Sequence, residues 1–220
     1  MCGRFSLSTD KDDLQSRFGF VEREGALLKP RFNIAPSQLH PVIVIEDDHR
    51  FLKMMKWGLV PHWAKDEKIG YKMINARSEG IETKPSFRAS FKRHRCLVPT
   101  TGFYEWKKID AKTKQPYFIR LKSGEPFAFA GLWEVWGPDR LETFTIITTE
   151  NNELIEHIHT RMPVILHEKD EAIWLDPELR DVDKLKELLK PYPSEEMEMY
   201  EVSTIVNSPK NESPDCIKPI

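Results

Sequence analysis

The strongest constraint on the fold is a succession of β-type segments between residues 95 and 149. These are "RCLVP" (95–99), "GFYEW" (102–106), "PYFIRLK" (116–122), "FAFAGLWEVW" (127–136) and "TFTIITT" (143–149). Short breaks and Gly, Pro or charged turns separate them. Strands that follow one another without alternating helices argue against a doubly wound sheet. We therefore predict an α+β fold, with an antiparallel, barrel-like β-sheet core and peripheral helices.

The rest of the chain adds strands and a few short helices. Further strands are predicted at 41–46, 50–58, 163–168 and 199–204, and the first two of these should pair. Helices are predicted at 8–20, 151–159, 168–175 and 181–193, with Thr9 as the cap of the first. Residues 57–95 mix aromatic and basic side chains between Pro and Gly. That is long for a featureless connection, so the segment should carry function or short elements of its own.

The length fits one domain, residues 1–220 with a polar C-terminal tail at 206–220, and we expect a monomer. No apolar run approaches the ~20 residues that span a bilayer, and a secretory signal is missing, so we expect a cytoplasmic protein. Cys2, Cys96 and Cys216 form no C-x-x-C pair. Glu156 and His159 have a metal-type spacing, but few carboxylates lie nearby in sequence to complete a shell. We expect no metal and no cofactor.

Charge is distributed unevenly. Residues 1–167 carry 26 Lys and Arg against 21 Asp and Glu, whereas residues 168–220 carry 7 against 14. A nucleic-acid partner would therefore bind a local patch on the first three-quarters of the chain. The densest basic run is "KPSFRASFKRHR" (84–95), which contains no acid. A solvated loop or helix face explains that run equally well.

Cys2 is the first candidate reactive residue. Removal of Met1 would leave a residue that bears both a free α-amine and a thiol. The amine, with a pKa near 7.7–8.0, is partly unprotonated at neutral pH and attacks aldehydes to form a Schiff base. The thiol can then close a five-membered thiazolidine, a step favoured because it is intramolecular. Position alone also permits an incidental cysteine.

Three further motifs contain candidate site residues. In "MINARSEG", Asn75 and Arg77 lie two apart and share a face of an extended segment, where they can hold a phosphate or sugar. In "TGFYEW", Glu105 lies between two rings, and desolvation would raise its pKa. In "HIHTRMPVIL", His159 suits proton transfer near neutrality. Singly, each has an ordinary structural explanation.

Taken together, "MCGRF", "NARSE", "GFYEW" and "HTRMPVIL", in this order, resemble the SRAP (SOS response-associated peptidase) family, also described as abasic-site processing proteins. The resemblance covers residues 1 to about 206 and is nearest to bacterial or phage members. It implies a β-rich fold, a groove for single-stranded DNA, removal of Met1 and a thiazolidine link to a ring-opened abasic site. It also implies association with the nucleoid when DNA is bound.

By motif match, Cys2 would be the nucleophile. Asn75 would be a second catalytic residue, and Asn75 and Arg77 together would hold the DNA. Arg4 and Arg161 would contact phosphates, while Glu105 and His159 would move protons. Trp63 and Pro36 are candidate platforms for stacked bases, as is Trp57, although at least one of these Trp residues should pack in the core. A Schiff base would also permit β-elimination, a lyase side reaction.

Two other functions fit parts of the same pattern. In the first, Cys2 and His159 form a thiol peptidase pair, whose minimal activity would be removal of Met1. In the second, the chain is a non-catalytic single-strand binder that uses Arg77 and the bases of 84–95. Peptide turnover in trans would favour the first, and retention of Met1 the second.

Overall fold

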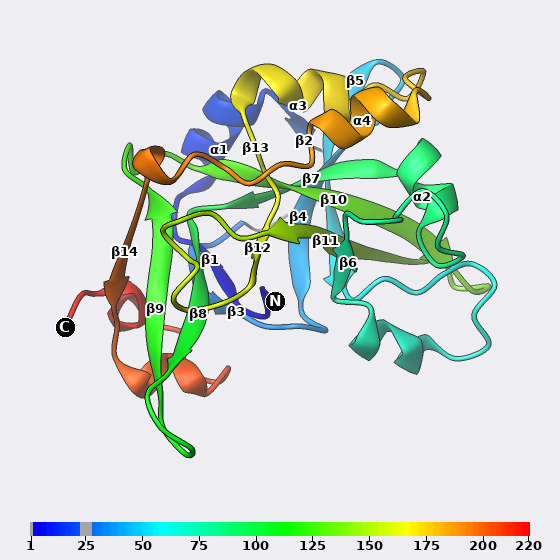
Figure 1. The fold of residues 1–220 in the computed structure, drawn as a ribbon. Coiled ribbons are helices and arrows are strands. Elements are labelled where there is room, and N and C mark those ends of the chain that lie inside the picture. Colours follow the sequence, from blue (N-terminus) through cyan, green and yellow to red (C-terminus); the bar gives the residue numbers. More distant parts are fainter. Residues whose placement is uncertain (1, 23–27) are drawn as a thin grey trace.

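The computed structural model describes residues 2–22 and 28–220, and a closed ring of five strands forms its centre (Figure 1). Antiparallel pairs join four of the five neighbours, and a parallel pairing of Phe144 with Trp57 closes the ring. Around the ring the strands are β4 (Leu39–Glu46), β5 (His49–Trp57), β11 (Leu141–Glu150), β10 (Phe127–Trp136) and β7 (Arg95–Thr100). The barrel-like core predicted from the sequence is confirmed.

Short strands extend the barrel at its edges. They are β2 (Val21–Glu22) beside β5, β6 (Asn75–Arg77) and β12 (Arg161–Pro163) beside β11, and β13 (Ile165–Leu166) beside β10. β6 runs parallel to β11, with Asn75 opposite Ile146 and Arg77 opposite Thr148. β12 pairs with the same end of β11. The "NARSE" and "HTRMP" motifs thus meet on either side of one strand.

A second sheet packs beside the barrel. Its order is β14 (Met197–Glu201), β9 (Lys114–Leu121), β8 (Gly102–Lys108), β1 (Phe5–Leu7) and β3 (Arg31–Ile34). The chain passes from the barrel to this sheet at Thr101. A Cβ on Gly102 would lie 2.3 Å from the Phe118 ring, so only glycine fits there. β8 is thereby placed directly against β1, the strand that follows Cys2.

The helices are short and peripheral. α1 (Lys11–Phe18), α3 (Glu168–Leu175) and α4 (Val182–Glu187) lie above the barrel in Figure 1, and α2 (Arg88–Arg93) lies at its side. The remaining elements are the 3₁₀ turns η1 (Glu67–Lys72), η2 (Ser194–Glu196), η3 (Thr204–Asn207) and η4 (Pro214–Ile217). None of the helices in the described ranges is long and apolar enough to cross a membrane.

Two helix predictions need correction. Asp10, not Thr9, caps α1, because its carboxylate accepts the Asp13 N–H at 3.0 Å, whereas the Thr9 hydroxyl bonds to the Asp13 side chain. The segment 151–159 forms turns instead of a helix. The Asn152 side chain accepts the Ile155 N–H, as an N-cap does at the start of a helix, but only turns follow, closed by bonds from the Ile158 and His159 N–H groups to the Ile155 carbonyl.

His40 lies on β4 inside the barrel. It is buried against Phe5, with ring centroids 4.6 Å apart. Nε2 lies 2.9 Å from the Pro99 carbonyl and must donate to it, so Nδ1 carries no proton in the neutral ring. Burial lowers the pKa of His40 from 6.5 to about 3.

This histidine should make folding stability depend on pH. The unfolded chain takes up a proton below pH 6.5, whereas the folded protein resists it until about pH 3. The free energy of unfolding should therefore fall as pH drops through that window, by at most about 1.4 kcal/mol per pH unit from this residue. Urea unfolding at several pH values measures the slope. His40→Gln keeps a donor for Pro99 but does not titrate, so an unchanged slope in that variant would refute the assignment.

Candidate active site

Cys2 is fully buried at the entry to β1. Its Sγ lies 3.8 Å from the Arg4 carbonyl oxygen, and its own carbonyl accepts the Asn75 Nδ2–H at 2.8 Å. The parallel pairing of β6 with β11 places Asn75 there. Asn75 Oδ1 is buried and has no hydrogen-bond partner within the part of the chain that the structure describes. An acceptor is thus available next to Cys2.

Glu105 is buried on β8, three residues after the sheet crossing at Gly102. Burial raises the pKa of its carboxyl, and the electrostatic interaction with His159 opposes that rise. The raised pKa agrees with the expectation from "GFYEW". Its neighbours Tyr104 and Trp106 belong to a separate cluster with Phe118 and Val202. General burial, more than the flanking rings, therefore accounts for the desolvation.

The Cys2 thiol lies within electrostatic range of Glu105. Burial raises the pKa of the thiol, and the negative charge of Glu105 raises it further. The sulfur is therefore a neutral thiol at neutral pH. An activated peptidase cysteine needs the opposite environment, a nearby cation that lowers the thiol pKa.

His159 follows the turns of residues 151–158. The Asn151 side chain donates to the His159 carbonyl at 2.9 Å. The Nδ1 atom of His159 lies 3.0 Å from the Arg161 backbone nitrogen and 3.1 Å from the Arg161 carbonyl oxygen. When Nδ1 carries no proton, it can accept a hydrogen bond from the Arg161 N–H. When it carries a proton, it can donate a hydrogen bond to the Arg161 carbonyl. The backbone of Arg161 therefore holds the ring through Nδ1 in either state.

The Arg161 side chain is bound to Glu79. Both of its terminal nitrogens lie 2.9 Å from the Glu79 carboxylate oxygens, and Nε and Nη2 also donate to Thr148. Four of the five guanidinium N–H groups are thus used. Arg77, by contrast, is exposed on β6. Both arginines were expected to contact DNA. Arg77 is open to solvent, whereas the guanidinium of Arg161 is bound to Glu79 and Thr148.

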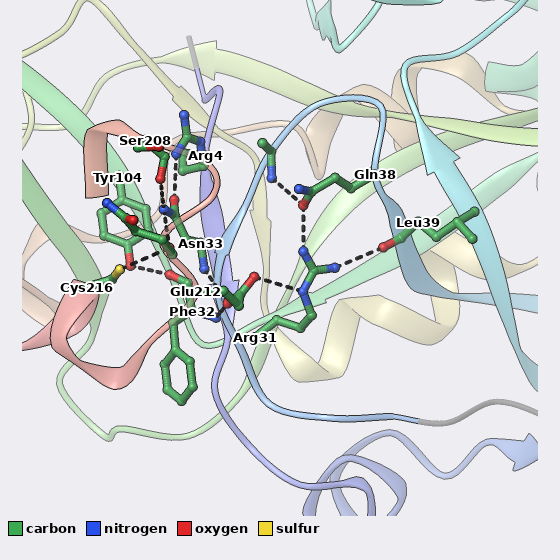
Figure 2. A network of polar contacts seen from close by, with 12 residues as sticks. Arg4, Arg31, Phe32, Asn33, Gln38, Leu39, Tyr104, Ser208, Glu212 and Cys216 are labelled. Atoms are coloured by element: carbon green, nitrogen blue, oxygen red, sulfur yellow. Dashed lines mark hydrogen bonds and ion pairs between the residues drawn. The ribbon is translucent and has the colours of Figure 1, made fainter. Parts of the chain in front are cut away.

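Arg4 points into a polar network (Figure 2). Its Nη1 donates to Asn33 Oδ1 at 2.6 Å and to the Val206 carbonyl at 2.9 Å. Burial lowers the pKa of its guanidinium. The structure therefore places this predicted phosphate contact in a network that reaches the C-terminal segment.

The predicted stacking residues differ in their surroundings. Trp63 is half exposed at a cavity of about 420 Å³ lined by His62, Trp63, Pro85, Arg88 and Ala89. Pro36 is partly exposed in the turn between β3 and β4. Trp57 is buried in the core and donates to the Ile74 carbonyl, as expected for at least one of these tryptophans.

The basic run 84–95 separates into two roles. Arg88, Lys92 and Arg93 are exposed on α2. Arg95 is buried and donates to five backbone carbonyls, those of Phe91, Lys92, Trp174, Asp176 and Leu179. Arg95 therefore ties α2 to α3 and cannot belong to a surface patch.

The Glu156–His159 spacing builds no metal shell. Glu156 lies 3.3 Å from His157, and both are exposed. No group of three or more His, Cys, Asp or Glu that could hold a metal occurs among residues 2–22 and 28–220.

The structure brings Cys2, Asn75, Glu105 and His159 together, through one hydrogen bond and two electrostatic contacts. Sequence reasoning missed Asn33 and Glu79, which hold Arg4 and Arg161. Glu79 lies within the "NARSE" motif, so its place in the sequence was a usable signal. Nothing local marks Asn33.

Comparison with known proteins gives a consistent result. The SOS response associated peptidase (SRAP) family model matches residues 1–209. The abasic site processing protein YoqW of Bacillus subtilis is 51% identical over 223 residues, 99% of each chain. The abasic site processing protein HMCES of Xenopus tropicalis is 31% identical over 268 residues, all of this chain and 78% of that one. A crystal structure of a Bacteroides thetaiotaomicron protein superposes with a TM-score of 0.90 at 31% identity, over 100% of both chains. The chain therefore belongs to the SRAP family.

Proposed function

We propose that this protein recognises abasic sites in single-stranded DNA and links itself to them covalently through Cys2 once Met1 is removed. The observation that carries the proposal is the placement of Cys2, with its carbonyl held by Asn75 and its thiol beside the buried Glu105. The names of the relatives, abasic site processing proteins, support the choice of substrate. The protein would act as a monomer in the response to DNA damage.

The chemistry begins at the sugar. A closed abasic sugar must open to its aldehyde, a step that needs one group to protonate the ring oxygen and another to take the hydroxyl proton. Glu105, which faces the Cys2 thiol, and His159, which interacts with Glu105, would carry these protons. Positioned proton transfer of this kind typically contributes ~10²–10⁴-fold.

The covalent link then forms in two steps. The Cys2 amine attacks the aldehyde carbon, and one water leaves as the imine forms. The thiol sulfur next adds to the imine carbon, and its proton passes to the nitrogen, which closes the thiazolidine. A buried neutral thiol suits this order, because it stays unreactive until an electrophile lies beside it. Asn75 Oδ1 offers an acceptor for a hydroxyl or amine proton during these steps.

DNA would be held mainly through phosphates. Arg77 is exposed on the strand that carries Asn75, and Arg88, Lys92 and Arg93 add exposed charge on α2. Trp63 and Pro36 offer surfaces on which bases of a single strand can stack. Arg161 can grip a phosphate with two N–H groups only after Glu79 leaves it. The imine intermediate also permits β-elimination, so weak strand cleavage is expected beside crosslinking.

Arg77→Ala should weaken DNA binding and reduce its salt dependence. Loss of one phosphate contact lowers the slope of log K against log salt by about 1. Fluorescence anisotropy with a single-stranded oligonucleotide at several salt concentrations measures both quantities. Arg180→Ala, an exposed arginine in the acidic C-terminal quarter, is the matched control. An Arg77 variant with the slope of wild type would remove Arg77 from the interface.

The proposal is tested by incubation of the protein with an oligonucleotide that contains one abasic site, followed by a denaturing gel. The control oligonucleotide carries a tetrahydrofuran at the same position and so lacks the aldehyde. We expect a shifted band with the first and none with the second. No shifted band with either oligonucleotide would reject covalent capture, and turnover of peptides would then favour the peptidase alternative.

A further inference from the structure

We propose that Asn33 is a positioning residue for the Cys2 reaction, and that it acts by fastening the strand that carries Cys2 to the C-terminal segment 203–220. This inference rests on the proposed function. Asn33 lies on β3 and is completely buried. Residues 206–220 were expected to be a polar tail, but the segment 203–220 folds into η3 and η4 and packs on β3 (Figure 2).

Every polar atom of the Asn33 amide is used. Oδ1 accepts the Arg4 Nη1–H at 2.6 Å. Nδ2 lies 3.2 Å from the Val206 carbonyl, 2.9 Å from the Ser208 carbonyl and 2.7 Å from the Asn211 carbonyl. A single buried amide thus joins Arg4 on one side to three carbonyls of residues 206–211 on the other.

Arg4 connects Asn33 and the C-terminal segment to Cys2. Its side chain is held by Asn33 and by the Val206 carbonyl. Its backbone carbonyl accepts the Tyr104 N–H at 3.0 Å and lies 3.8 Å from the Cys2 sulfur. Since Tyr104 precedes Glu105 on β8, the position of Arg4 sets where Cys2 stands relative to Glu105.

The C-terminal segment also braces both strands that flank β1. On the β3 side, Glu212 accepts the N–H groups of Phe32 and Asn33 and forms an ion pair with Arg31 (Figure 2). On the β8 side, Trp106 Nε1 donates to Asn207 Oδ1 at 2.8 Å. β1 lies between β3 and β8 in the sheet. The segment therefore clamps the strand that leads from Cys2 from both sides.

The chemistry is sensitive to such a clamp. Thiazolidine closure depends on holding amine, thiol and proton carriers in one geometry, and a displacement near 1 Å can cost 10²-fold in rate. Without Asn33, Arg4 would keep a partly buried positive charge with one acceptor fewer, and three C-terminal carbonyls would lose a donor. Arg4 would then be free to shift, and the Cys2 sulfur beside its carbonyl would shift with it.

The test separates positioning from DNA binding. Single-turnover crosslinking is measured with saturating abasic oligonucleotide, and the dissociation constant is measured with the tetrahydrofuran oligonucleotide. Asn33→Ala should slow crosslinking about 10- to 100-fold while the dissociation constant changes less than about twofold. Glu171→Gln is the control, because it disturbs a different buried polar contact, that of Glu171 on α3 with Arg17 on α1 and Arg50 on β5.

The outcomes differ clearly. A rate in Asn33→Ala equal to that of Glu171→Gln would overturn the proposal, as would a change confined to the dissociation constant. If Asn33→Ala does not fold, Asn33→Asp serves instead, since it keeps an acceptor for Arg4 but loses the three C-terminal bonds. It should still crosslink at least several-fold more slowly than the control. If the wild-type protein itself forms no adduct, the proposed function is rejected. That outcome is distinct from the comparison of Asn33→Ala with the control.

Discussion

Cys2→Ala should abolish the stable adduct with abasic DNA and leave DNA binding nearly unchanged. The alanine amine can still form an imine, but no thiol remains to close the ring, and an imine hydrolyses when the protein is denatured. The side chain packs in the hydrophobic core, and its polar contact, from Sγ to the Arg4 carbonyl at 3.8 Å, is weak, so the apolar alanine should disturb little else. Denaturing gels without reductant measure the stable adduct, and borohydride trapping reveals the remaining imine.

Two controls make this result specific. Cys96→Ala and Cys216→Ala remove the other buried thiols and should crosslink at the wild-type rate, because neither can present an α-amine. Strand cleavage through the imine should persist in Cys2→Ala. A stable adduct that survives denaturation in Cys2→Ala, with no reductant added, would show that another group makes the link.

Glu105→Gln should slow crosslinking about 10²- to 10⁴-fold, the usual contribution of a positioned proton carrier. Glutamine is nearly isosteric and stays hydrogen-bonding, but it neither gives nor takes a proton. Glu105 is buried, so the exposed arginines that we propose bind phosphate should be unaffected. Single-turnover rates at saturating DNA, together with the dissociation constant on the tetrahydrofuran oligonucleotide, isolate the chemical step.

The pH profile identifies what Glu105 does. Because burial raises its pKa, the carboxyl keeps its proton to a higher pH than an exposed glutamate. If the proton opens the sugar, the wild-type rate falls as pH rises through that pKa, and the falling limb should be absent in Glu105→Gln. Crosslinking at the wild-type rate in this variant would show that Glu105 has no part in the reaction.

Much of the fold could be predicted from local pattern. The β-branched and aromatic runs at 41–46, 127–136 and 143–149 became barrel strands, because apolar strands of that kind need a closed or covered sheet. The helix expected at 151–159 was wrong: the Asn152 side chain caps the first turn as at a helix start, but only turns follow before β12. A capping signal and an apolar spacing predict where a helix can begin, whereas tertiary contacts decide whether it continues.

The site was predictable to the extent that its residues lie in motifs. The sequence singled out Cys2, Asn75, Glu105 and His159, and the structure brings them together. The supporting contacts were not predictable. Asn33 reaches Arg4 and the C-terminal segment across 29 and more than 170 positions. Arg95, which looked like part of a basic surface, binds carbonyls nearly 80 positions away.

If the Cys2 amine and thiol together capture an abasic site, intact-protein mass spectrometry before and after incubation with a single-stranded abasic oligonucleotide should detect the product. We expect a protein that has lost Met1, followed by an adduct with the mass of protein plus oligonucleotide minus one water. This adduct should survive denaturation in wild type and be absent in Cys2→Ala. A protein that retains Met1 and forms no adduct would show that Cys2 does not capture abasic sites in this way.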